Sequence, residues 1–532
     1  MGWGLDMGSI QRDTKNGPPQ YDSTDKYVFS YQGVSSELVS IGTGEYRAKD
    51  EALFLKFVFD STNDRWTVTD KSGTLHTFGD NPGSRQTNAL GTFKWALSKV
   101  KDTSGNTMTL SYAADNGQLY PSAVEYNGNQ TQSFAHSHKV EFTLEDRDDK
   151  SFSYVSRAKV STLKRLSNIQ VKVKDASGAY QLAKKYALGY EYSAATKRSR
   201  LTTVTEYGKD GATSLPATTF VYQDKLQEFE SMVDAGAILR MSASDDYDFV
   251  RSSTQEETVV DYLDVDGDAI HDRLESTSTN ANWNIQYGTG TGFGLLVNFY
   301  GTLYVPDSTP SRRHIAWTNS SKQQVTDLAD INADGLPDRV LSQDNNTSWT
   351  VQRNSNALGF ESSNSSWGAI SRMVSNTNYD HIRWSPVWDL TGTQVFVDFF
   401  DLNGDGLPDR VMAESGNSTW KVQWNTGSGF SSMQSWAGAD LMTSGEPERY
   451  AIRLVNNERQ TRVDIVDLNG DGLPDRIQAA TNNAYWKVQW NTGAGFSPLE
   501  DLAPSSGSNP TQSGTSSGMR TPQEPMSRIC ST

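Results

Sequence analysis

Asp401-Leu-Asn-Gly-Asp-Gly-Leu-Pro-Asp-Arg410 is an acidic stretch that occurs four times, with small changes, in the second half of this 532-residue chain. The other copies begin at Asp264, Asp330 and Asp467, which gives spacings of 66, 71 and 66 residues. A tryptophan follows the first aspartate of every copy at an offset of 19 residues. Spacings kept this closely indicate an internal repeat of about 67 residues. The four tryptophans are Trp283, Trp349, Trp420 and Trp486.

Each repeat has the local pattern of β-strands. In Trp420-Lys-Val-Gln-Trp-Asn-Thr-Gly-Ser-Gly-Phe430, apolar and polar residues alternate before a glycine-rich turn, which indicates a strand with one buried face. A repeat of this length accommodates four short strands, the size of one propeller blade. No 3.6-residue period is visible, which argues against a helical solenoid. We therefore predict an all-β chain in which residues 236–502 form four β-propeller-type blades.

The acidic stretch has the composition of a calcium loop. Positions one, three, five and nine carry carboxylate or carboxamide oxygens, and position seven offers its backbone carbonyl. Such an all-oxygen set suits Ca²⁺, and glycine at position six, which Ala269 replaces in the first copy, permits a sharp turn. An EF-hand requires glutamate at position twelve, where three copies have Leu341, Met412 and Gln478. The loops instead resemble the nine-residue calcium loops of integrin-α-type propellers with FG-GAP or VCBS-like repeats. The predicted ligands are Asp264, Asp266, Asp268, Ile270 and Asp272; Asp330, Asn332, Asp334, Leu336 and Asp338; Asp401, Asn403, Asp405, Leu407 and Asp409; and Asp467, Asn469, Asp471, Leu473 and Asp475.

Two interpretations of these loops are open. The side chains bind Ca²⁺, or they form Asx-turns that cap hairpins without a metal. In either case we expect a structural role, because loops without an open coordination position do not make a catalytic centre. The arginine that follows each loop is expected to pair with a nearby carboxylate and to fasten its repeat. These arginines are Arg273, Arg339, Arg410 and Arg476.

The first half of the chain shows no such repeat and reads as a series of β-hairpins. Trp66–Phe78 alternates on both sides of a turn at Asp70–Gly73, and Trp95–Tyr112 alternates around a turn at 102–106. These patterns are typical of two-stranded hairpins. We predict a β-hairpin domain over residues 1–230 and a disordered tail over residues 503–532, which are rich in Ser, Gly, Pro and Thr.

Several motifs of the first half resemble a known family. Gly2-Trp-Gly-Leu-Asp-Met-Gly-Ser-Ile-Gln-Arg12, Trp66–Thr74 and Trp95–Asn106 are similar to the N-terminal domain of the Salmonella virulence plasmid B protein family. Bacterial insecticidal toxin complexes share that domain in their B component, often beside RHS repeats. Tyr190–Tyr192 and Ser199–Gly208 look RHS-like. The resemblance extends to about residue 500, because the toxin B components also carry an FG-GAP-type propeller after this domain.

The resemblance also has implications for the length of the whole protein and for the compartment in which it functions. Family members continue beyond both ends of this chain, so we expect the sequence to be a fragment of a secreted, extracellular protein. No signal peptide is visible at Met1, and no run of 18 apolar residues could span a membrane. The single cysteine, Cys530, excludes an intrachain disulfide.

Composition and motifs argue against a nucleic-acid partner and against an enzyme. The net charge of −16 is the wrong sign for phosphate recognition. Neither His-Glu-x-x-His nor Gly-x-x-x-x-Gly-Lys occurs, and the six histidines are scattered. The family's ADP-ribosyl transfer belongs to a separate C-terminal domain, so the resemblance implies no catalytic residue here. We expect a non-enzymatic protein.

Two functions are compatible with these observations. The resemblance implies a component of a secreted bacterial toxin complex, whose propeller docks onto a pore-forming subunit and whose hairpin domain forms part of a shell around an RHS-type cargo. The alternative is a calcium-dependent, integrin-like adhesin or a glycan-binding propeller, in which tryptophans such as Trp424 and Trp490 stack on sugars.

Overall fold

The computed structural model describes residues 7–502 except residues 16, 194–195, 223–236, 241–244, 254–255, 301–309, 357–358, 389–391, 443–444, 457, 482 and 484. The predicted disordered tail and residues 1–6 of the family motif lie outside the described residues. The described chain is all-β, as predicted. None of its helices is long and apolar enough to cross a membrane. Short 3-10 helices lie at Pro82–Ser84, Asp245–Asp248, Pro310–Arg313, Thr377–Asp380 and Pro447–Tyr450.

The N-terminal sheet begins as a closed barrel of eight strands. β1 pairs with β2 on one side and with β9 on the other, so the path β1-β2-β3-β4-β5-β6-β7-β9 returns to its start. Aromatic side chains fill the interior, where Tyr27 and Trp66 lie edge to face with ring centroids 5.0 Å apart. Closure pairs every strand on both sides and removes open edges. The strands are β1 (Ser9–Arg12), β2 (Tyr27–Tyr31), β3 (Val34–Gly42), β4 (Glu45–Ala48), β5 (Lys56–Asp60), β6 (Arg65–Thr69), β7 (Leu75–Phe78) and β9 (Gly91–Lys101), with β8 (Arg85–Asn88) paired to β9.

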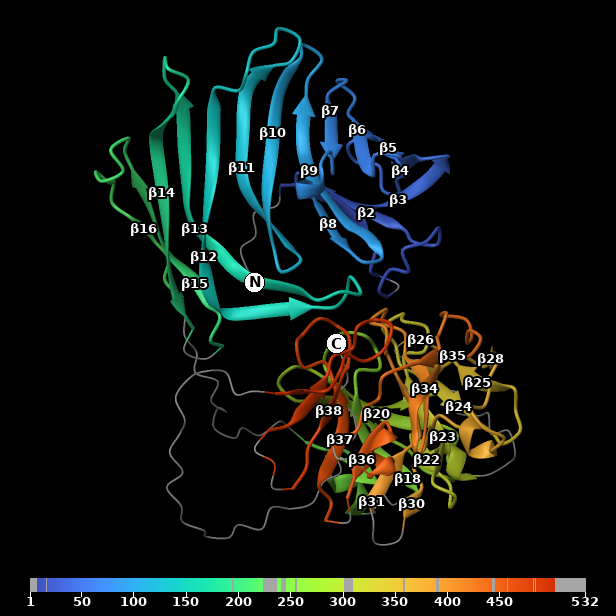
Figure 1. Ribbon diagram of the computed structural model, residues 1–532. Coiled ribbons are helices and arrows are strands. Elements are labelled where there is room, and N and C mark those ends of the chain that lie inside the picture. The colour runs from blue at the N-terminus through green and yellow to red at the C-terminus, as the bar shows by residue number, and fades with distance from the viewer. Residues whose placement is uncertain are drawn as a thin grey trace.

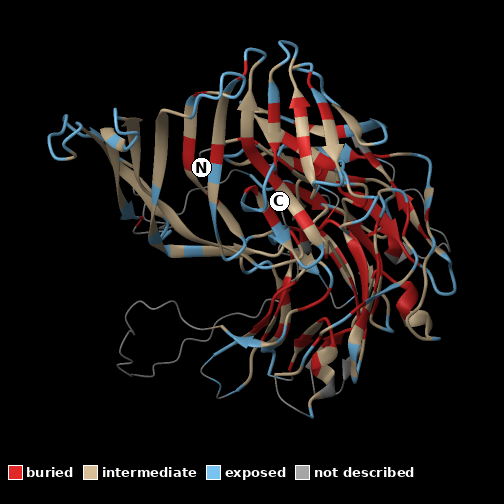
Figure 2. Cartoon of the chain, turned by 45° about the horizontal axis from the view of Figure 1, so that its top comes forward, coloured by how far each residue is buried: buried red, intermediate tan, exposed pale blue. Residues whose placement is uncertain are grey.

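Beyond β9 the same sheet continues as a single layer of long antiparallel strands (Figure 1). Every residue of β13 and of β15 is half-buried, whereas a sheet covered on one face alternates between buried and solvated positions. Figure 2 shows this contrast between the tan strands of the layer and the red-banded barrel and repeats. The strands of the layer are β10 (Asn106–Asp115), β11 (Gln118–Asn129), β12 (His138–Ser153), β13 (Val160–Lys174), β14 (Tyr180–Tyr192), β15 (Ser199–Tyr207) and β16 (Thr218–Thr219).

Both hairpins predicted in the first half are present. β6 pairs with β7 and β9 pairs with β10. At each turn an aspartate side chain accepts backbone N–H groups, as Asp70 does from Ser72 at 2.8 Å and Asp102 from Asn106 at 2.8 Å. The closure of β1 onto β9 was not predicted, because the alternation of a strand does not say which distant strand will pair with it.

The second half contains four antiparallel meanders of four strands, one for each sequence repeat. All four follow the same order, with the acidic loop between the first and second strands. That these units are blades of a propeller stays a prediction. The meanders are β18 (Glu257–Leu263), β19 (Asp272–Glu275), β20 (Trp283–Gly288) and β21 (Phe293–Phe299); β23 (Gln323–Ala329), β24 (Asp338–Leu341), β25 (Ser348–Gln352) and β28 (Ser365–Gly368); β32 (Val397–Phe400), β33 (Asp409–Glu414), β34 (Asn417–Gln423) and β35 (Gln434–Trp436); and β37 (Thr461–Val466), β38 (Asp475–Gln478), β39 (Lys487–Gln489) and β40 (Glu500–Asp501).

Short strands join the first strands of neighbouring meanders. β22 (Ala316–Thr318) lies between β18 and β23, and β29 (Arg383–Trp384) lies between β23 and β32. β36 (Arg453–Val455) connects β31 (Gly392–Val395) to β37 in the same way. Hydrogen bonds therefore run through the first strands of the first three repeats, and the fourth repeat is bonded through β36 to β31, the strand that precedes β32 in the chain. The remaining strands are β17 (Ser252–Ser253), β26 (Asn354–Asn356), β27 (Gly359–Phe360) and β30 (Val387–Trp388).

An aromatic contact joins each repeat to its successor. Phe496 of the fourth repeat packs edge to face against Trp420 of the third, with ring centroids 5.2 Å apart. The three tryptophans in such contacts are fully buried, and each indole N–H donates to a backbone carbonyl 30 or 31 residues later. Each tryptophan is thus covered by the repeat that follows it. The equivalent pairs are Phe430 with Trp349 and Phe360 with Trp283.

The fourth tryptophan is placed differently. Trp486 precedes β39 instead of opening a strand, and 54% of its surface is exposed. The sequence pattern predicted the same strand position for all four tryptophans, and for Trp486 this is wrong. The physical reason is that, among the described residues, no phenylalanine of a later repeat packs on it.

Removal of a junction phenylalanine is predicted to destabilise the repeats. Phe496→Ala deletes a side chain that is 8% exposed and contacts Trp420 and Trp436, so we expect a loss of about 3–5 kcal/mol in the free energy of unfolding. Phe54→Ala is the matched control, because Phe54 is 67% exposed, and its effect should stay within about 0.5 kcal/mol. Urea unfolding followed by tryptophan fluorescence measures both. Equal stabilities of the two variants would contradict the role of the junction.

Candidate functional site

The first aspartate of each acidic loop accepts hydrogen bonds from backbone N–H groups of its own loop. In the third loop Gly404 and Gly406 donate to the two oxygens of Asp401 at 2.7 and 2.8 Å. In the fourth loop Gly470 donates to Asp467 at 2.8 Å. The first and second loops repeat the pattern around Asp264 and Asp330. These are Asx-type turns, and they bend each loop back over its first residue.

The oxygens at positions three and five lie close to that first aspartate. Asp264, Asp266 and Asp268 each place a carboxylate oxygen within 4.8 Å of the other two. In the other loops the asparagine at position three donates to the aspartate at position five, as Asn332 does to Asp334 at 2.9 Å. The structure therefore brings together the predicted ligands at positions one, three and five.

In the second and fourth loops the residue at position seven turns its side chain toward the preceding loop. A Cβ atom on Gly404 would lie 3.1 Å from Leu473 Cδ2, and one on Gly267 would lie 3.2 Å from Leu336 Cδ2. Both glycines have positive φ, so their backbone conformation and the close approach of leucine require a residue without a side chain. The first loop thus touches the second, and the third touches the fourth.

The aspartate at position nine is buried in every loop, and in the first, third and fourth loops it accepts two kinds of backbone hydrogen bond. Asp409 accepts from Leu402 at 3.0 Å and from Asn425, 16 residues later, at 2.9 Å. Burial raises the pKa of Asp409 well above its ordinary value and raises that of Asp475 to about 7. The members of this group are Asp272, Asp338, Asp409 and Asp475, each at most 1% exposed.

The loops fit a hard cation by their donor chemistry. Burial raises the pKa values of Asp330, Asp401 and Asp405 above their ordinary value. Backbone hydrogen bonds act in the opposite direction but do not cancel this effect. In the second loop one oxygen of the buried Asp338 has no hydrogen-bond partner among the described residues. Crowded, desolvated carboxylates are stabilised by a positive ion. Asx-turns are therefore present, and calcium binding stays a prediction that the donor set supports.

The arginine after each loop was predicted to pair with a nearby carboxylate, and this holds for only some of the loops. Arg273 pairs with Glu275, but the hydrogen bonds of Arg410 go to Gln423 at 2.8 Å and to the carbonyl of Ser371 at 2.6 Å. Arg476 likewise donates to Gln489 and to backbone carbonyls. Burial lowers the pKa of Arg410 and of Arg476 to about 9. The prediction of a carboxylate partner is wrong for these two arginines, because the neutral Gln amide 13 residues later takes that place.

Sequence reasoning also missed an asparagine that connects neighbouring loops. The side-chain amide of Asn491 donates to the carbonyl of Leu402 in the preceding loop at 2.8 Å, while its backbone N–H donates to Asp475 of its own loop at 2.9 Å. Its fixed position, five residues after the repeat tryptophan, was the available signal. Asn354 and Asn425 make the same two contacts.

The β12–β13 hairpin connects the N-terminal domain to the fourth repeat. The ladder is interrupted between Asp146 and Ser151, and the far end of the hairpin bends toward the repeats in Figure 1, as bulged strands do. Phe152 packs edge to face on Trp490 at 4.7 Å. The Tyr154 N–H donates to Asp471 of the fourth loop at 2.7 Å. A loop with predicted calcium ligands is thus also part of the interdomain contact.

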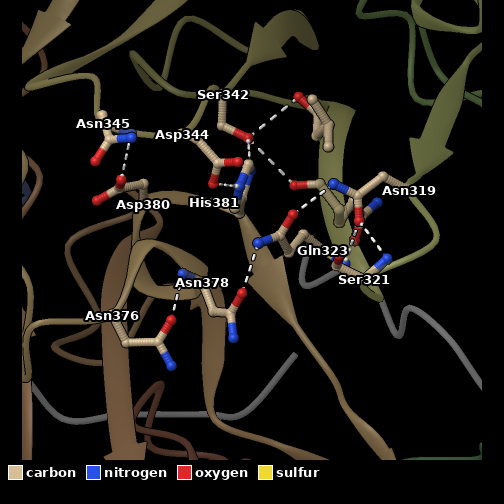
Figure 3. A network of polar contacts seen from close by, with 12 residues as sticks. Asn319, Ser321, Gln323, Ser342, Asp344, Asn345, Asn376, Asn378, Asp380 and His381 are labelled. Atoms are coloured by element: carbon tan, nitrogen blue, oxygen red, sulfur yellow. Dashed lines mark hydrogen bonds and ion pairs between the residues drawn. The ribbon is translucent and has the colours of Figure 1, made fainter.

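A Ser–His–Asp network lies at the junction after the second repeat (Figure 3). Ser342 Oγ is 3.0 Å from His381 Nδ1, and His381 Nε2 is 3.0 Å from Asp344 Oδ1. The set has the residue types of a nucleophilic triad. However, Ser342 is only 1% exposed, so no substrate atom reaches its hydroxyl in this structure.

The repeats indicate what this network does. The residue after the carbonyl that accepts the tryptophan N–H is His314, His381 or Ala451 in successive junctions. The buried residue 12 positions after the first aspartate of the loop changes with it, from Ser276 and Ser342 to Ala413. Equivalent positions are therefore occupied by a serine and a histidine in the first two junctions and by two alanines, Ala413 and Ala451, in the third. We infer a structural role for the pair.

Residues 401–475 match the family model of the FG-GAP-like repeat. Part of the chain is 25% identical over 159 residues to the Mono(ADP-ribosyl)transferase SpvB of Salmonella choleraesuis and to that of Salmonella enteritidis. The resemblance to the Salmonella virulence plasmid B protein family is confirmed. The match covers 24% of this chain and 26% of the relatives, so the chain spans about a quarter of their length and the activity in their name is not carried over to it.

Solved structures of toxin complexes and of SpvB are among those similar to this chain. The Photorhabdus luminescens Tc holotoxin pore aligns with 94% of this chain and 27% of its own, with 16% identity and a TM-score of 0.46. TcdB2-TccC3 without its hypervariable C-terminal region gives the same coverage and identity and a TM-score of 0.47. The N-terminal domain of the effector SpvB from Salmonella typhimurium strain LT2 covers 39% of this chain and 88% of its own, with 17% identity and a TM-score of 0.34.

The junction histidine predicts a pH dependence of stability. Burial lowers the pKa of His381 below its ordinary 6.5, although Asp344 acts in the opposite direction. The unfolded chain therefore binds a proton more readily, and the stability contributed by neutral His381 is full above pH 6.5 and is lost as the pH falls below it. Between pH 6.5 and 5 the free energy of unfolding should fall more steeply in the wild type than in the double variant Ser342→Ala, His381→Ala.

The single variant Ser342→Ala is the control, because it keeps the histidine and should keep the steeper dependence. Urea unfolding at closely spaced pH values measures the three slopes. Parallel curves for the wild type and the double variant would contradict the assignment.

Proposed function

We propose that this chain is a non-catalytic structural component of a secreted bacterial toxin complex. In this proposal the single-layer sheet forms part of a protein wall around a toxic cargo, and the repeats dock onto a pore-forming subunit as propeller blades. The family resemblance supplies the class of assembly. The observation that carries the proposal is the single layer of long strands beyond the barrel.

That layer lacks a hydrophobic core of its own. The buried cluster of the N-terminal domain includes Leu110 and Val124 of β10 and β11 but no residue of β13, β14 or β15. Cross-strand ion pairs such as Lys172–Glu141 and Arg165–Glu145 join its strands. Such pairs add little stability to an exposed sheet. A sheet of this size, half-buried on both faces, has the properties of a wall that other protein segments cover.

The far edge of the layer is available for further pairing. β15 pairs on its outer side with the two-residue strand β16, at Thr203–Thr219 and Val204–Thr218, and with Ser214 at Tyr207, so β16 forms the edge of the described sheet. Unpaired backbone groups at a sheet edge are a template for strands of another chain. An RHS-type partner composed of β-hairpins would continue the sheet at this edge.

The repeats and the sheet are held in a defined relation by the bent β12–β13 hairpin. Tyr21 and Asn88 of the barrel bond the carbonyl of Ser156 at 2.7 and 2.8 Å, and Phe152 and Tyr154 contact the fourth repeat. The hairpin end is therefore fixed from both sides. Because of these contacts, the position of the repeats on a docking partner would determine the position of the sheet.

Calcium fits this proposal as a structural ion of the loops. Asp401, Asn403 and Asp405 of the third loop would hold it, with the carbonyl of Leu407 and Asp409, and the other loops would use the equivalent residues. When bound, Ca²⁺ neutralises the crowded carboxylates and ties the ends of the loop together. Extracellular surroundings, which are rich in calcium, suit a secreted component.

Calcium is predicted to raise the unfolding temperature of the full chain. With EDTA replaced by ~10 mM Ca²⁺, a site with a dissociation constant near 10⁻⁴ M stabilises by roughly 2.7 kcal/mol. Differential scanning calorimetry should show a shift of several degrees. Asp401→Ala should reduce the shift, whereas Asp22→Ala in an exposed N-terminal turn should not. Identical unfolding temperatures with EDTA and with Ca²⁺ would leave the loops as Asx-turns.

Assembly is predicted to depend on the edge of the sheet. The full chain, co-expressed with the pore-forming subunit and the RHS-type component of its source organism, should elute in one complex on size exclusion. Thr219→Pro removes the backbone N–H that points away from β15 in the exposed strand β16, and proline at an outward-facing edge position blocks strand addition without disturbing a core. It should reduce recovery of the RHS-type component at least tenfold.

Thr62→Pro, in the exposed turn between β5 and β6, is the control and should leave the complex intact. If the folded wild-type chain elutes alone in the presence of both components, the toxin-complex proposal fails. If Thr219→Pro assembles normally, the partner joins at another surface and the proposed role of this edge is wrong.

A further inference from the structure

A cleft of about 530 Å³ lies between the N-terminal domain and the last two repeats. Gln20 and Arg157 line it from the N-terminal side, and Trp424, Gln434 and Trp436 line it from the third repeat. Its volume is within the range of ligand sites, which occur preferentially at domain interfaces. The interdomain contacts of Phe152 and Tyr154 lie outside this cleft, because neither residue is part of its lining.

One wall of the cleft is aromatic. Trp424 is half-buried and packs edge to face against Trp436, with ring centroids 5.7 Å apart and an interplanar angle of 75°. Trp436 is 3% exposed, and its indole N–H has no hydrogen-bond partner among the described residues. A buried donor without a partner costs free energy, and the half-buried Trp424 gives this wall an apolar ring.

The rest of the lining is mostly polar and carries one charge of each sign, Arg157 from the N-terminal domain and Asp405 from the third repeat. Arg157 Nη1 donates to Gln20 Oε1 at 3.0 Å, and Arg157 Nε has no partner among the described residues. Asp405 lines the same cleft with the opposite charge. Gln20 and Gln434 are exposed and present both amide donors and acceptors. This arrangement favours a neutral ligand that has many hydrogen-bonding groups.

We propose that this cleft binds a neutral oligosaccharide. A sugar ring has an apolar C–H face, which stacks on an indole, and a rim of hydroxyl groups, which bond amide and guanidinium side chains. A peptide anchored by apolar side chains fits less well, because none of the described residues that line the cleft is Leu, Ile, Val, Met or Phe. The proposal does not depend on the toxin-complex assembly.

The structure also distinguishes among the tryptophans that the sequence made candidates for sugar stacking. Trp490 is 6% exposed and is covered by Phe152, so its faces are used by the interdomain contact. Trp486 is 54% exposed but does not line the cleft. Trp424 alone of the three combines partial exposure with a polar enclosure.

The test is binding of defined neutral glycans by the full-length chain. A printed array of neutral oligosaccharides identifies binders, and calorimetric titration with the best trisaccharide measures the dissociation constant. Trp424→Ala should weaken binding at least tenfold, whereas Trp486→Ala, the matched tryptophan outside the cleft, should leave it unchanged. Gln20→Ala, a change at an exposed residue that should not affect folding, should weaken binding several-fold and serves if Trp424→Ala does not fold.

Three outcomes would overturn the proposal. They are the absence of saturable binding to any neutral glycan, equal affinity of the wild type and both cleft variants, and binding of a random peptide library at this cleft without binding of glycans. Saturable glycan binding that is lost with the cleft variants and kept with Trp486→Ala would establish the site.

Discussion

Asn425 and its equivalents make the connection on which the second half of the molecule depends. The backbone N–H of this asparagine bonds the buried Asp409 of its own loop, and its side chain bonds the preceding loop at the carbonyl of Ile331. Both contacts are buried, where an unpaired polar group is costly. One residue therefore fixes the shape of its own loop and the distance to the previous one. The phenylalanine that follows in the same turn covers the preceding tryptophan, so polar and apolar contacts of each junction come from a single segment.

The same arrangement explains why the acidic loops matter beyond their own hydrogen bonds. They lie at the end of the repeats that meets the N-terminal domain, where Tyr154 bonds Asp471 and Gly17 approaches Asn403. Any ion or ligand that changes the third or fourth loop would act directly on the interdomain contact. The closed barrel and the repeats each have a buried core, whereas the layer between β11 and β16 gains few buried residues. A molecule with two domains that have buried cores and one half-buried sheet between them is suited to assembly with other proteins.

Much of the repeat region could be predicted from the sequence, because its signals are local. The offset between Asp401 and Trp420 and the alternation after Trp420 indicate strands of fixed order. The ligand oxygens at positions one, three and five could be predicted for the same reason. The glutamine partners of Arg410 and Arg476 could not, since an arginine in a sequence of many carboxylates gives no indication that a neutral amide will face it. The exposure of Trp486 could not be predicted either, because burial depends on a neighbouring repeat.

The sequence by itself determined the all-β class, the four repeats, the hairpin turns at Asp70 and Asp102, and the acidic composition of the loops. Each follows from residues within one turn or one strand pair, where spacing and side-chain chemistry act directly on the backbone. Only the tertiary structure decided the pairing of β1 with β9, the single-layer sheet, the contact of Phe152 with Trp490 and the cleft beside Trp424. These features join segments far apart in the chain, and their free energy depends on long-range packing that no local pattern encodes.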